Sequence, residues 1–103
     1  MQSEVTTRET TGTTPRFPLG QMVMTQGAAT ALDEANQSPF EFLNRHQSGD
    51  WGDLCEDDKQ ENEFSIKEGF RLLSAYHTTK RKKLYVITEA DRSATTILLP
   101  EEY

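Results

Sequence analysis

The sequence predicts an α+β fold in which about three N-terminal helices pack on one face of a C-terminal three-stranded antiparallel meander. Alanines and a clear helix start occupy the first half of the chain, while β-branched and aromatic residues dominate the last third. Short polar turns separate the expected strands, which favours antiparallel neighbours. With 103 residues the chain has room for one domain, and we place it at residues 17–103.

The first 16 residues predict a disordered tail. They contain six threonines, and their apolar residues are Met1 and Val5 alone. Ordering a residue costs about 1–2 kcal/mol of conformational entropy, which so little apolar surface does not offset. Residues 21–24 alternate polar and apolar only in part, so they can add a short fourth strand at an edge of the sheet.

Two helices are expected next, joined by a two-residue turn. Residues 25–36 are rich in alanine and begin with Thr25, a good N-cap. The second helix begins at Ser38, with proline in its first position and Glu41 three residues after the cap, which predicts a capping box. Gly49 is a natural C-terminal stop.

Residues 55–68 predict a third helix. Three acids crowd its first turn, where the positive end of the helix dipole favours them. Its apolar residues do not fall on one stripe, so we expect a surface helix with one side in solvent. Gly69 ends the pattern.

Three strands follow, at residues 70–76, 84–88 and 95–99. The middle segment has the highest content of β-branched and aromatic residues in the chain. Polar turns at 79–81 and 90–93 connect the strands, and Pro100 ends the last one. Short connections between consecutive strands predict the meander.

The charge is unevenly distributed. The chain carries 17 acids and 11 bases, a net charge of -6. Residues 50–68 hold eight acids against two lysines, whereas residues 69–103 hold a small excess of bases. The overall field therefore does not steer the protein to nucleic acid, although a local basic loop can still contact phosphate.

Several classes of protein and of site are excluded. No apolar run approaches the roughly 20 residues of a membrane-spanning helix. Cys55 is the only cysteine, so an intramolecular disulfide and a cysteine-based zinc site are excluded. Acidic neighbours raise the cost of a thiolate there, and we interpret Cys55 as unreactive. A lone cysteine and an N-terminus without a signal-peptide pattern predict a cytoplasmic protein.

Several separate motifs occur in order along residues 17–103, and together they resemble one family. They are Phe17-Pro18-Leu19-Gly20, His46 with Gly49-Asp50-Trp51-Gly52, Glu68-Gly69-Phe70-Arg71, Ile87-Thr88-Glu89-Ala90-Asp91-Arg92-Ser93 and Leu99-Pro100-Glu101-Glu102-Tyr103. The family consists of short, uncharacterised bacterial proteins carried on plasmids and integrative elements, labelled "plasmid-related protein". The resemblance implies a bacterial cytoplasm and a mobile element, and no activity. Cys55 departs from the family pattern, which has a polar residue there; this argues against an essential thiol.

One group of residues suggests metal or acid–base chemistry. His46, Asp50 and Asp53 lie within eight positions, with Trp51 between them. An imidazole and two carboxylates can bind a divalent cation or move protons. A structural interpretation competes with this one: the histidine would end a helix, an aspartate would cap the next helix, and the tryptophan would be buried where the second and third helices meet the sheet.

A second group is basic and lies at the tip of a predicted hairpin. Four consecutive bases on an exposed turn can contact phosphates, and His77 and Tyr85 beside them can stack on a base. Charges at such a tip also discourage aggregation of strand edges. The four bases are Lys80, Arg81, Lys82 and Lys83.

A third group comprises candidate partner-binding residues. An acidic helix can occupy a basic protein surface in the manner of a DNA mimic, or it can simply be solvated. The turn at residues 89–93 can be functional or only a connection. The candidates are Glu56, Asp57, Asp58, Glu61, Trp51, Asp91 and Arg92.

The leading hypothesis is a non-enzymatic accessory protein of a mobile element that acts as a small protein-interaction module, without a cofactor. We expect a monomer at physiological salt, because contacts between exposed charges are weak. The alternative is a nucleic-acid-binding regulator that uses the loop at residues 80–83. A third hypothesis is a small metal-dependent hydrolase around His46 and Asp50.

Overall fold

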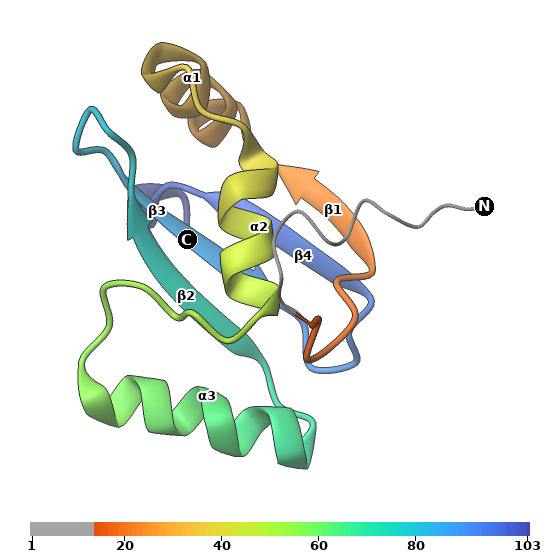
Figure 1. Cartoon of the computed structure of the whole chain (residues 1–103). Coiled ribbons are helices and arrows are strands. Elements are labelled where there is room, and N and C mark those ends of the chain that lie inside the picture. Colours follow the sequence, from red (N-terminus) through yellow and green to blue (C-terminus); the bar gives the residue numbers. More distant parts are fainter. Residues whose placement is uncertain (1–13) are drawn as a thin grey trace.

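The computed structural model describes residues 14–103. Residues 1–13 of the expected tail lie outside the described part of the chain. An edge strand and three helices come first, followed by three strands and a final 3-10 turn (Figure 1). The elements are β1 (Gln21–Met24), α1 (Gln26–Ala35), α2 (Pro39–Gln47), α3 (Glu56–Glu68), β2 (Leu72–His77), β3 (Lys83–Thr88), β4 (Ala94–Leu98) and η2 (Pro100–Glu102).

The sheet has the order β1-β4-β3-β2 and is mixed. Strands β2, β3 and β4 form the expected antiparallel meander, but β1 pairs in parallel with β4, with Gln21 opposite Ala94 and Met24 opposite Ile97. The sheet as a whole is therefore four-stranded and mixed, not the three-stranded antiparallel sheet that we expected, and the short edge strand allowed at residues 21–24 is confirmed as its fourth member. A parallel pair needs a long connection, and here all the intervening helices and strands supply it.

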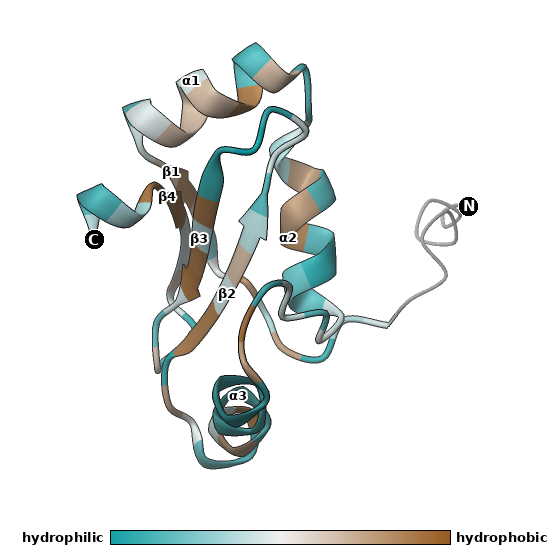
Figure 2. Cartoon of the chain, turned by 90° about the vertical axis from the view of Figure 1, so that its left-hand side faces the viewer, coloured by the Kyte–Doolittle hydropathy of each residue, from teal (hydrophilic) through white to brown (hydrophobic). Residues whose placement is uncertain are grey.

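The helices do not all cover one face of the sheet as we expected. Figures 1 and 2 show α2 across one face, α1 over one end of the sheet and α3 alongside β2 at the opposite end. On the other face, the ring of Tyr103 after η2 packs edge-on against Tyr85, with 6.0 Å between ring centroids. As expected, α3 is a surface helix, because Asn62 and Ser65 are its buried residues.

Two clusters of buried side chains form the core. The larger joins α1 and α2 to the sheet, and Phe42 and Tyr76 meet in it with ring centroids 5.4 Å apart. The smaller contains Phe17, Trp51 and Leu72, with Ile66 of α3 packed against it. The smaller cluster connects the N-terminal segment to the third helix.

The helix ends follow the predicted caps with two exceptions, one of which is α3: its N-cap residue is Cys55, without a side-chain bond, and not the expected aspartate. The hydroxyls of Thr25 and Ser38 accept hydrogen bonds from the backbone amides of the first turns of α1 and α2. The predicted capping box at Ser38 is incomplete: the carboxylate of Glu41 accepts from the side-chain amide of Gln37, at 3.1 Å. A glutamine just before the cap competes for this carboxylate, so the helix start is still stabilised, but by a different bond.

The outer edge of β2 is closed by contacts from the segment before it and from α3. Residues 51–53 run beside the strand: Asp53 N–H donates to the carbonyl of Ala75 at 2.6 Å, and Ala75 N–H to that of Trp51 at 3.2 Å. Gly52 has a φ of +76°, and a Cβ there would collide with the Ala75 carbonyl. The side-chain amide of Asn62 makes two further bonds, one to Leu73 N–H and one to its carbonyl.

The burial of Trp51 is confirmed, since only 4% of its surface is exposed. We predict that Trp51→Ala lowers the free energy of unfolding by about 3–5 kcal/mol, because it leaves a cavity in the smaller cluster. Phe64→Ala is the matched control, because Phe64 is 51% exposed on α3, and it should cost no more than about 1 kcal/mol. Urea titration measures both, and equal losses would contradict the assignment of Trp51 to the core.

Candidate functional site

His46 lies at the centre of a buried chain of polar side chains. It is fully buried. Its Nδ1 lies 2.6 Å from Ser74 Oγ on β2, and its Nε2 lies 2.9 Å from Thr88 Oγ1 on β3. Thr88 Oγ1 is 2.7 Å from Thr95 Oγ1 on β4, and the Thr95 hydroxyl donates to the carbonyl of Leu19 at 2.8 Å. One histidine thus connects α2, three strands and the N-terminal segment.

The environment keeps this imidazole neutral. Burial, with a smaller contribution from the charge of Arg92, lowers the pKa of His46 to about 3. The rings of Phe17 and Trp51 pack edge-on against it, at centroid distances of 5.2 and 5.7 Å. A neutral imidazole has one donor and one acceptor nitrogen, and both find a hydroxyl here. His46 is therefore a structural residue, because an acid–base catalyst must reach its substrate.

The three residues of the predicted metal group point to different partners. Asp50 accepts from Arg45 Nε at 2.7 Å, and this bond is the main reason its pKa is lowered. Asp53 pairs with His77 Nδ1 at 2.6 Å on the surface, while His46 faces the sheet. Within residues 14–103 no three histidine, cysteine, aspartate or glutamate side chains gather as metal ligands do. The geometry does not support the metal-dependent hydrolase.

Trp51 and Glu63 belong to a second connected set, which the sequence analysis missed in part. The indole Nε1 donates to Glu63 Oε2 at 3.0 Å, and Arg16 makes a two-pronged pair with the same carboxylate, at 2.8 and 2.9 Å. Arg16, which we had placed in the tail, is thereby attached to α3. Its sequence signal was weak: an arginine directly before the first buried aromatic residue, Phe17.

Arg92 serves the fold rather than a partner surface in this arrangement. Its guanidinium donates to four backbone carbonyls, from Ser65 at the end of α3 and from Phe70, Glu89 and Ala90. Asp91 is exposed, and its carboxylate accepts from the Ser93 amide at 3.0 Å, closing the turn. The turn at 89–93 is therefore held by its own charged residues.

The acidic candidates lie together at the N-terminal end of α3. All four are exposed in its first two turns, while the residues that attach the helix to the domain, Asn62, Glu63 and Ser65, come later in it. Cys55 is the N-cap residue, also exposed, and its side chain makes no capping bond. The four acids, which we call the acidic face, are Glu56, Asp57, Asp58 and Glu61.

The basic candidates lie together on the β2–β3 turn. The buried Thr78 hydroxyl accepts from the backbone amides of Lys80 and Lys82, at 3.2 and 3.1 Å. Arg81 has a φ of +66°, and Lys83 Nζ lies 5.5 Å from the centroid of the Tyr85 ring. The turn thus has a fixed backbone, and its four basic side chains are exposed.

Comparisons with protein-family models, curated proteins and solved structures find no match to this chain. No helix in the described part of the chain is long and apolar enough to span a membrane.

The buried histidine predicts a specific pH dependence. In the unfolded chain His46 takes up a proton near pH 6.5, but in the folded protein only near pH 3. Its folded-state pKa is depressed, so acid favours unfolding: between about pH 7.5 and pH 5 this residue should lower the free energy of unfolding by about 2 kcal/mol.

Two variants test this dependence. His46→Gln should be less stable at neutral pH and should lose the pH slope in that window. His77→Gln, which removes the exposed histidine, should keep it. Chemical denaturation at a series of pH values measures the slope, and an unchanged slope in His46→Gln would rule out this residue as its source.

Proposed function

We propose that the chain is a non-enzymatic accessory protein of a bacterial mobile element that binds a protein partner through the acidic face of α3. The observation that carries the proposal is a division along this helix: its first two turns are exposed and acidic, and the residues that attach it to the domain come after them. Asn62, Glu63 and Ser65 attach the helix to β2, Trp51, Arg16 and Arg92, while the four residues of the acidic face, in the turns before them, are exposed.

A helix fixed in this way suits binding by charge. Little conformational entropy remains to be lost when a rigid helix meets a partner. Its exposed carboxylates favour a basic partner surface and speed encounter with it at low salt. A protein surface that normally binds nucleic acid has this chemistry, which includes an inhibitor of the DNA-mimic type. The cytoplasm and the mobile element follow from the family resemblance, and no cofactor is required.

The first test neutralises the acidic face. We predict that the fourfold variant Glu56→Gln, Asp57→Asn, Asp58→Asn and Glu61→Gln loses the partner captured from a bacterial lysate, because the attraction to a basic surface is removed. The control variant Asp33→Asn, Glu34→Gln and Glu41→Gln removes charge from α1 and α2 and should retain the partner.

Quantitative mass spectrometry of the captured proteins at several salt concentrations is the measurement, and circular dichroism verifies that both variants are folded. A specific partner that binds the fourfold variant as well as the native chain would refute the assignment of the acidic face.

A second function, binding of nucleic acid, is favoured by one specific observation. The exposed bases of residues 80–83 project from a backbone that Thr78 holds in place. A fixed row of positive side chains beside an aromatic ring can contact phosphates and a base. The net charge of -6 opposes this function, so it depends on local geometry.

The second function has its own test. If the turn binds nucleic acid, Lys82→Glu with Lys83→Glu should weaken binding at least about tenfold at about 50 mM salt, because phosphate contacts are lost. Lys59→Glu with Lys67→Glu makes the same change of charge on α3 and should have a smaller effect. Gel-shift titration with single-stranded and double-stranded DNA measures both, and equal weakening would remove the turn as the contact.

A further inference from the structure

The two edges of the sheet differ in a way that points to assembly. The edge at β2 is closed by residues 51–53 and by Asn62. The edge at β1 pairs with no other segment among residues 14–103. The amide of Gln21 donates to the carbonyl of Ser93, just before β4, and that of Thr25 to the carbonyl of Ile97 in β4. The alternating backbone therefore directs the amide and carbonyl groups of Met22 and Met24 away from the sheet.

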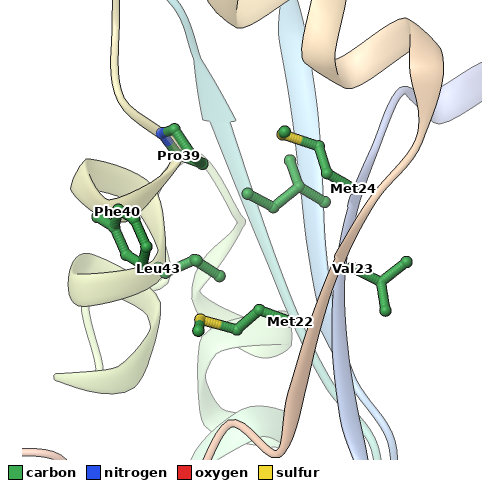
Figure 3. Close-up of a pocket in the computed structure, with 7 residues that line it drawn as sticks. Met22, Val23, Met24, Pro39, Phe40 and Leu43 are labelled. Atoms are coloured by element: carbon green, nitrogen blue, oxygen red, sulfur yellow. The ribbon is translucent and has the colours of Figure 1, made fainter.

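An apolar groove of about 160 Å³ lies between β1 and α2. Met22 and Met24 point from the strand toward Phe40 and Leu43 of α2, while Val23 points to the other face (Figure 3). The exposed fractions are 50% for Met22, 41% for Met24 and 55% for Phe40. An unpaired strand edge thus borders a patch of exposed apolar side chains.

Apart from its shortness, this edge lacks the usual protection. Natural edge strands carry a lysine, a proline, an inward charge or a bulge that prevents pairing with another chain. The strand Gln21–Met24 carries none of these, and the residues that line the groove are all uncharged. Such an edge is suited to be covered by another strand of similar chemistry.

We infer that a second copy of this chain covers the β1 edge, with the two β1 strands antiparallel across a two-fold axis at Val23. The edge is complementary to itself. Met22 of one copy exchanges two hydrogen bonds with Met24 of the other, and Met24 of the first copy does the same with Met22 of the second. The methionines of both copies lie on the same face, between the two α2 helices.

The distribution of charge leaves this edge as a place where a second copy can approach. Two molecules that each carry -6 repel one another, and the uncharged groove is where they can approach closely. The acidic face lies at the opposite end of the sheet, beside β2 (Figure 1), so it stays far from the two-fold axis. The inference does not depend on the proposed function, because the two use different surfaces.

The size of the contact sets its strength. A four-residue strand and one groove bury less than a standard interface of about 1,600 Å², so the dimer should be reversible and form at micromolar concentrations. Because apolar contacts drive it, it should persist at about 0.5 M NaCl, where attraction between exposed charges is screened. This result would replace the monomer expected from charge alone.

Sedimentation velocity of the full chain tests the inference from about 5 to about 500 μM, at about 0.15 and 0.5 M NaCl. Met24→Lys adds the missing edge charge and should weaken the dimer at least tenfold at both salt concentrations. Phe64→Lys alters another exposed apolar residue, on α3, and should leave the dimer unchanged. Thermal unfolding verifies that both variants are folded.

A crosslink tests the register. Opposed residues of a non-hydrogen-bonded pair have Cα atoms about 4.5 Å apart, within the range of about 4.4–6.8 Å that a disulfide tolerates. In a Cys55→Ser background, Val23→Cys should form a disulfide dimer under mild oxidation, and Thr96→Cys on β4 should not.

If the full chain stays monomeric at all concentrations, the inference is overturned. The edge would then have another occupant, either residues 1–13 or a different protein. A dimer that Met24→Lys does not weaken, or a crosslink no stronger at Val23 than at Thr96, overturns it as well.

Discussion

The structure depends on keeping one histidine neutral and fully hydrogen-bonded inside the core. His46 has no contact with solvent, and leaving either ring nitrogen without a partner there would cost about 1–3 kcal/mol. Ser74 and Thr88 satisfy both nitrogens, and Thr95 extends the chain to the carbonyl of Leu19. Because these partners come from three strands and the N-terminal segment, the bonds form together only when the strands are in register and α2 lies across them.

The same use of polar bonds in place of apolar packing explains how α3 is held. Its apolar residues do not form a stripe, so hydrophobic burial alone would attach it weakly. Asn62 binds the backbone of β2, Glu63 accepts from both Trp51 and Arg16, and the carbonyl of Ser65 accepts from Arg92. These are directional contacts in the later turns of the helix. They orient α3 and leave the acids of its first two turns exposed.

The sequence predicted what local chemistry determines. The caps at Thr25 and Ser38, the third helix and the three C-terminal strands all follow from composition and turn residues. The parallel partner of β1 depends on a pairing between residues more than 70 positions apart, which no local pattern encodes. The metal site suggested by His46, Asp50 and Asp53 is not supported either, because closeness in sequence does not determine where side chains point. In the fold the three residues contact different partners. Trp51 could be assigned to the core because it falls between two expected helices.

The two edges of the sheet show how one sequence can separate two kinds of contact. The edge at β2 is closed by a glycine that approaches the strand and by one asparagine amide, so the acidic helix lies beside strands that cannot pair further. The edge at β1 is left apolar and open among the described residues, at the other end of the sheet order. If two copies join there, the result is an eight-stranded sheet with an acidic helix at each end. Two weak electrostatic contacts on one rigid body can then engage a partner together, and their combined affinity exceeds that of either contact alone when the partner offers two basic surfaces at the matching distance. In that case dimerisation at the open edge would strengthen binding through the acidic face, because the dimer presents two such faces to one partner.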